Sequence, residues 1–189
     1  MLSGETARKR GRLAEARRSY EESLAINEAL ASRFIVGILH GNLAFVACGE
    51  RRLDEARRHV TAALREYATS GSFTVALPAV VGLAEIAQAE GDDGRALALL
   101  GLVLGHPGNR QDHRLECERV LAPIRQRRTP AAVEAGLAAG GALALDTLTG
   151  EILSDRPGPT PARRSRGRGR PRSRGPAARR ASSASRGAL

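Results

Sequence analysis

The stretch GERRLDEARRHVTAALRE (residues 49–66) decides the fold, because its pattern occurs again 40 residues earlier and 40 residues later. The other two copies are KRGRLAEARRSYEESLAI (9–26) and AEGDDGRALALLGLVLGH (89–106). The aligned positions are Ala16, Ala56 and Ala96, then Tyr20, Val60 and Leu100, then Ser23, Ala63 and Val103, then Leu24, Leu64 and Leu104. Within each copy the spacing is i, i+4, i+7, i+8, which places these side chains on one face of an amphipathic helix. The period therefore predicts three related helical units.

The segment upstream of each copy repeats as well. Leu43, Ala44 and Ala47 match Leu83, Ala84 and Ala87 at the same period. Each unit is thus predicted to be a helix, a short polar turn and a second helix, with small alanines that let the two helix backbones approach closely. Neither helix can bury its apolar stripe alone, so we expect the units to stack into an all-α helical solenoid.

This pattern resembles the tetratricopeptide repeat, in which a small and apolar first helix and a Gly/Asp turn precede A-x3-(Tyr/Val/Leu)-x2-small-Leu. Gly11 and Gly91 stand at the turns and favour this family over HEAT-type repeats, although Arg51 replaces the turn glycine of the middle unit. The period exceeds the usual unit of about 34 residues and is similar to the variant repeats of MalT-like and AfsR-like bacterial regulators. The resemblance covers roughly residues 2–153. It implies a sensor or assembly region that follows an ATPase, kinase or cyclase module.

Three parts are predicted along the chain. Residues 1–106 carry about two and a half repeats; the first helix keeps only its last turns, which indicates a fragment of a longer array or a truncated product. Residues 107–155 are expected to form capping helices: one from about Gln111 to Arg127, one starting at Thr129-Pro130, and one from Asp146 to about Leu153. The expected apolar face of the first capping helix is Leu115, Val120, Leu121 and Ile124.

Residues 156–189 form a basic tail with 11 arginines and no acidic residue, whereas residues 1–155 hold 19 basic and 20 acidic residues. The tail has too few apolar side chains to offset the entropy of ordering, so we predict that it is disordered. An AT-hook-like core makes candidate nucleic-acid-binding residues of Arg166, Arg168, Gly169, Arg170, Pro171 and Arg172. An extended RGR segment can lie in a narrow minor groove. The alternatives are non-specific attraction to phosphates and a tail without a dedicated role.

The inner surface of the solenoid is the second candidate site, because the first helices of successive units line it in the tetratricopeptide fold. The candidate partner-binding residues there are Ile38, Asn42, Phe45, Glu85 and Gln88. Phe45 is one of three phenylalanines and either contacts a partner or packs against the neighbouring unit. A clamp for C-terminal carboxylates, known in one class of these repeats, is not expected, because Pro78 and Gly82 stand where basic residues would be needed.

The sequence offers no catalytic set, so we expect neither an enzyme nor a cofactor. His106, His113 and Cys117 lack a fourth metal ligand and are expected to be surface histidines and a half-buried cysteine. His40 and His59 are expected to stand alone. The two cysteines, the lack of a secretory signal and the lack of a membrane-length apolar run favour the cytoplasm. The expected function is a protein-interaction or scaffold module with an unidentified protein partner, or with the missing modules of a longer chain; nucleic-acid binding through the tail is the alternative.

Overall fold

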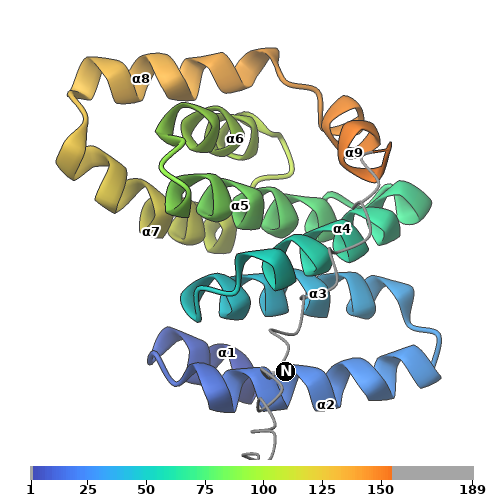
Figure 1. Ribbon diagram of the computed structural model, residues 1–189. Helices are drawn as coiled ribbons and strands as arrows, with labels where there is room; N and C mark the ends of the chain where they lie inside the picture. The colour runs from blue at the N-terminus through green and yellow to red at the C-terminus, as the bar shows by residue number, and fades with distance from the viewer. Residues whose placement is uncertain (1, 155–189) are drawn as a thin grey trace, which may run out of the picture. The chain divides into compact units, whose positions relative to one another are not determined.

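The computed structural model describes residues 2–154, and every regular element within that range is helical (Figure 1). The α-helices are α1 (Leu2–Lys9), α2 (Leu13–Ala29), α3 (Arg33–Gly49), α4 (Leu53–Ser70), α5 (Phe73–Ala89), α6 (Asp93–Gly105), α7 (Gln111–Arg127), α8 (Pro130–Ala139) and α9 (Leu145–Ser154). A short 3-10 helix, η1 (Gly140–Ala142), follows α8. The all-α prediction is confirmed for this range, all of which belongs to one compact unit. The predictions for residues 156–189 lie outside it.

The first six helices form three hairpins, α1–α2, α3–α4 and α5–α6. Each hairpin packs on the next, through α2 against α3 and through α3 and α4 against α5. The turn inside each hairpin carries a residue with positive φ at the same register: Gly11 at 73°, Arg51 at 62° and Gly91 at 87°. The left-handed backbone at these three positions lets the chain reverse direction within a few residues in each hairpin.

The first two positions of the predicted repeat stripe are buried in all three copies; at its last position Leu64 is buried, but Leu24 and Leu104 are only half-buried. Ala16, Ala56 and Ala96 are fully buried, and so are the next positions along the stripe, Tyr20, Val60 and Leu100. Small side chains at the first of these positions allow close helix crossing, while the larger side chains one turn later fill the remaining space. The sequence period therefore identified the core positions of the second helix of each hairpin.

Two glycine-lined contacts bring α8 and η1 onto α6. An added Cβ at Gly101 would lie 2.0 Å from the carbonyl oxygen of Leu137, and one at Gly140 would lie 2.3 Å from the carbonyl oxygen of Ala98. Backbone therefore touches backbone where these helices cross, which side chains larger than hydrogen would prevent.

The C-terminal helices close the stack against earlier elements: α7 packs on α5 and α6, α8 on α6, and α9 on α4. The predicted cap at Thr129 is confirmed, since its hydroxyl accepts a hydrogen bond from the Ala132 amide at 3.3 Å. The α9 contact includes a hydrogen bond of 2.7 Å from the Tyr67 hydroxyl to Asp146. Among the helices of residues 2–154, none is by itself long and apolar enough to cross a membrane; the bent pair of residues 130–142 and 145–154 reaches that length and composition only when its parts are combined.

The predicted apolar face of α7 is wrong at one position. Leu115 is 57% exposed, whereas the buried face consists of His113, Cys117, Val120, Leu121 and Ile124. Those five residues follow the spacing i, i+4, i+7, i+8, i+11 of a single helix face, and Leu115 lies off it. His113 and Cys117, expected to be a surface histidine and a half-buried cysteine, are therefore core residues.

Candidate partner-binding groove

A pocket of about 220 Å³ lies among α1, α3, α5 and α7. Three of the five predicted partner-binding residues, Ile38, Asn42 and Phe45, line it together. They come from α3, where they follow one another at helical spacing along one face. The pocket is bounded by four helices, from α1 at the start of the described chain to α7 after the repeats. We call this pocket and its walls the groove.

The groove combines apolar walls with a polar side chain that has no hydrogen-bond partner within the described residues. Ile38, Pro78 and Leu115 supply apolar surface from α3, α5 and α7, respectively. The half-buried Asn42 amide, between them, forms no hydrogen bond within the described residues. An amide in that position retains two donors and an acceptor for a ligand. The displaced Leu115 thus belongs to the groove, although the sequence had assigned it to the core.

Phe45 forms part of the groove wall but is itself covered. Its side chain is 5% exposed. The guanidinium carbon of Arg8 lies 5.1 Å from the ring centroid, and that of Arg119 lies 5.6 Å from it. Both distances fit cation–π contacts. Of the two roles that the sequence left open for Phe45, packing against neighbouring elements is the one seen.

The two arginines over Phe45 belong to an ion network that spans the groove. Arg8 of α1 binds Glu116 of α7 through two nitrogens, at 2.5 and 3.2 Å. Glu116 also accepts from Arg119 Nε at 3.0 Å, and Arg119 binds both carboxylate oxygens of Glu85 at 2.7 Å. Burial opposes the ionisation of Glu116, but the hydrogen bonds from Arg8 and Arg119 outweigh it and lower the pKa of this carboxyl.

The remaining two predicted residues lie outside the pocket. Glu85 reaches the groove indirectly, as the α5 partner of Arg119. Gln88 is half-buried one turn further along α5 and lines neither pocket described here. Sequence reasoning missed Arg8, Glu116 and Arg119, because α7 lies beyond the repeats and carries no period that would place it opposite α1.

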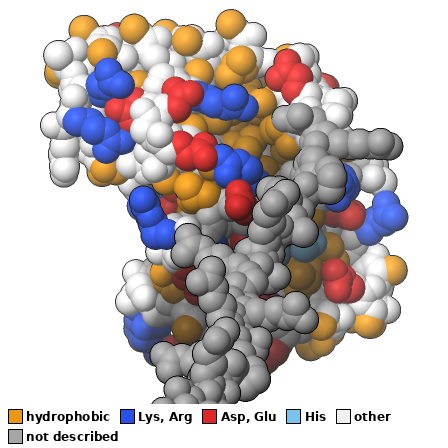
Figure 2. Space-filling view, in the orientation of Figure 1, with side chains coloured by type: hydrophobic (Ala, Val, Ile, Leu, Met, Phe, Trp, Pro, Cys, Tyr) orange, Lys and Arg blue, Asp and Glu red, His pale blue; other side chains and the backbone are white. Residues whose placement is uncertain are grey.

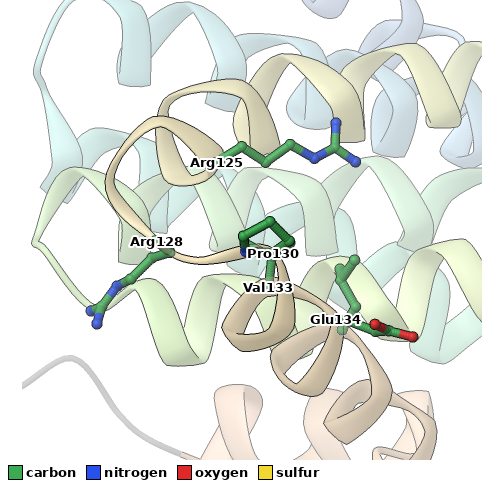
Figure 3. A pocket seen from close by; sticks show the side chains of 6 residues that line it. Arg125, Arg128, Pro130, Val133 and Glu134 are labelled. Atoms are coloured by element: carbon green, nitrogen blue, oxygen red, sulfur yellow. The ribbon is translucent and has the colours of Figure 1, made fainter.

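A second pocket, of about 360 Å³, lies between α7 and α8 (Figure 3). Pro130 and Val133 form its apolar base, and Arg125 and Arg128 point away from each other at its edge. Arg125 pairs with Glu118, and Arg128 donates to Asp93 at 2.9 Å. Both cations already have acidic partners, whereas Glu134, which also lines this pocket, forms no hydrogen bond or ion pair within the described residues. On the face shown in Figure 2, basic and acidic side chains alternate and do not gather into a patch of one sign.

The histidines and cysteines form no metal site in the part of the chain that the structure describes. The expectation that His40 and His59 stand alone is wrong, because their Nδ1 atoms lie 3.0 Å apart, between α3 and α4. Burial raises the pKa of the Cys48 and Cys117 thiols to about 12, which keeps them protonated near neutral pH.

Comparison with known proteins finds no match for this chain among protein-family models, curated proteins or solved structures. The functional argument therefore depends on the residues and geometry described above.

Proposed function

We propose that this chain is a tetratricopeptide-like interaction module that binds a protein partner in the groove. One observation carries the proposal: four helices from distant parts of the sequence converge on a pocket that presents apolar side chains beside the free Asn42 amide. An apolar side chain of a partner would fill the space beside Ile38, Pro78 and Leu115, and an adjacent polar group would satisfy Asn42. This function is binding and requires neither a catalytic group nor a cofactor.

The tetratricopeptide assignment draws its support from the 40-residue period and from the three hairpins with left-handed turn residues at one register. A place in a bacterial signalling or transcriptional regulator, in the cytoplasm, rests on the sequence resemblance. The partner would then be another protein or a module of a longer parent chain.

The test is a peptide selected from a random library on the full chain, with its dissociation constant measured by fluorescence anisotropy. Leu115→Glu places a charge on the groove wall, and we expect it to weaken binding by at least about tenfold, or about 1.4 kcal/mol. Leu143→Glu is the matched control, because Leu143 is 37% exposed and lies outside the groove. Peptides that bind both variants as tightly as the parent would refute the groove as the binding site.

Nucleic-acid binding through the tail is the second candidate function. The observation that favours it is the run of 11 arginines without an acidic residue in residues 156–189. These residues lie outside the described part of the chain, so the support is electrostatic.

A further inference from the structure

The Arg8–Glu116 ion pair joins two helices that are far apart in sequence. Arg8 lies in the last turn of α1 and Glu116 in α7, 108 residues later. The two side chains are 9% and 16% exposed, respectively, so the pair is largely shielded from solvent. Shielded, bidentate Arg–carboxylate pairs are strongly directional, and breaking one leaves an uncompensated charge. We refer to this pair as the clasp.

Apart from the clasp, α1 is held by its packing against α2. The helix has 8 residues, which is too short to be stable on its own. Its packing is against α2, where Ala7 is fully buried and Gly4 sits against the Tyr20 ring. The Glu5–Lys9 pair lies within α1 itself and is half exposed, so it does not hold the helix to any other element.

The position of the clasp also sets the width of the groove. Arg8 and Glu116 belong to the α1 and α7 walls of the pocket, and Ile38 and Asn42 line it from α3. Both walls are thus fixed at the distance that a guanidinium–carboxylate contact allows. α1 and α7 lie on the same side of the stack in Figure 1.

We propose that α1 is a lid on the groove and that the clasp holds it shut, which limits access for the partner. This regulation rests on the proposed function, because it controls entry to the same site. Release of the clasp swings α1 away from α7 about its contact with α2 and exposes Ile38, Asn42 and the Phe45 ring. A partner that binds the open groove shifts the equilibrium toward release in proportion to its preference for that state.

The test measures the distance from α1 to α7 in the full chain, without any partner. Spin labels at Thr6→Cys and Arg114→Cys occupy exposed positions on the two helices. The native Cys48 and Cys117 are buried and remain unlabelled. Pulsed electron paramagnetic resonance then reports the distribution of distances between the labels. We expect one narrow population in the parent.

Arg8→Met retains an apolar cover over Phe45 but removes the charge, and Glu116→Gln removes the opposite charge. We expect each variant to add a longer and broader distance population, and the double variant to resemble either single variant, because all three lose the same contact. Arg8→Lys keeps a positive charge at this position, so we expect most molecules to retain the narrow distance population of the parent. Lys9→Met is the matched control, since it removes a cation from the same pocket but leaves the clasp intact.

A distance distribution that stays narrow in both Arg8→Met and Glu116→Gln would overturn the lid, and so would equal broadening in Lys9→Met. Peptide binding gives a separate readout: a groove-binding peptide should associate several-fold faster with Arg8→Met than with the parent, and an unchanged or slower rate would count against gating. The two proposals fail differently. If Leu115→Glu does not change the peptide dissociation constant, the groove is not the binding site. The distances between the spin labels test the clasp without any peptide.

Discussion

At the scale of single residues, the three hairpin turns share a left-handed backbone conformation but not the same residue type. Arg51 has φ of 62°, at the position where the other two hairpins have Gly11 and Gly91. A left-handed conformation costs a residue with a side chain about 1–2 kcal/mol. Glycine avoids this cost, but it loses more conformational entropy on folding, which offsets part of the gain.

Arg51→Gly should therefore stabilise the protein by about 0.5–1 kcal/mol, since it removes this strain, and since Arg51 forms no ion pair within the described residues. The reciprocal variant Gly91→Ala, at φ of 87°, should destabilise it by about 1 kcal/mol. Urea unfolding at neutral pH measures both changes. Shifts of the same sign in the two variants would contradict the argument.

The His40–His59 contact predicts loss of stability in mild acid. Burial, and then the neighbouring His40, lower the pKa of His59 from 6.5 to about 4, and burial lowers the pKa of His40. A folded-state pKa below the unfolded value means that the stabilisation is complete above pH 6.5 and is lost as the pH falls toward 4. Glu55 at 3.8 Å from His59, together with Glu28 and Glu66 near His40, offsets this only in part.

We expect the free energy of unfolding to fall by on the order of 2 kcal/mol between pH 7 and pH 4.5 because of this pair. The double variant His40→Gln/His59→Gln should lose distinctly less over the same interval. Urea titrations of both proteins at the two pH values make the comparison. Equal losses would show that the two imidazoles do not carry the effect.

At the scale of elements, the sequence was informative wherever local chemistry decides the outcome. The expected bounds of α7 and the Thr129 cap agree with the structure, because helix breakers and caps act within a few residues. The buried face of α7 was assigned incorrectly at Leu115, which is apolar but lies off the face that His113 and Cys117 occupy. His113 is nevertheless buried, with its Nδ1 accepting a hydrogen bond from the Arg110 amide.

The crossing of α6 and α8 yields a prediction that the sequence period alone does not. Gly101→Ala should destabilise the protein by about 2–3 kcal/mol, because its Cβ would meet the Leu137 carbonyl oxygen and the backbone has to move. Gly105→Ala, one turn later in the same helix, has no atom within 4 Å of the added Cβ. It should be neutral or slightly stabilising. Thermal unfolding distinguishes the two, and a similar loss in both would mean that helix propensity, and not the crossing, sets the effect.

At the scale of the whole molecule, successive units are joined by ion pairs that could not be predicted from the sequence. Arg17 binds Glu50 at 2.6 Å, and Arg57 binds Glu90 in the next unit. Arg17 and Arg57 are 40 residues apart, and so are Glu50 and Glu90. The alignment of the repeats therefore shows that these residues are equivalent, but it does not show that they pair. The pairing depends on how one hairpin stacks on another. The Arg8–Glu116 pair has no repeated counterpart to suggest it, because it spans the stack from α1 to α7.

Charge distribution over the full chain gives the last prediction. The net charge of +10 arises from residues 156–189, since residues 1–155 have 19 basic and 20 acidic residues. The chain should therefore bind duplex DNA weakly through phosphates, with an affinity that falls steeply as salt rises. At about 0.15 M salt, where exposed charges are already screened, we expect no more than a few-fold preference for A·T-rich over G·C-rich duplexes.

Arg170→Ala removes one of these 11 cations, and it should weaken binding to both duplexes about equally if only phosphates are contacted. Arg186→Ala is the matched control, because it removes the same charge outside the Arg168-Gly169-Arg170-Pro171 core. Competition binding with the full chain compares the variants. A minor-groove hook predicts a different result: an A·T preference of about a hundredfold, or about 2.7 kcal/mol, that Arg170→Ala abolishes and Arg186→Ala leaves in place. That outcome would make sequence-selective DNA binding, and not charge alone, the function of the tail.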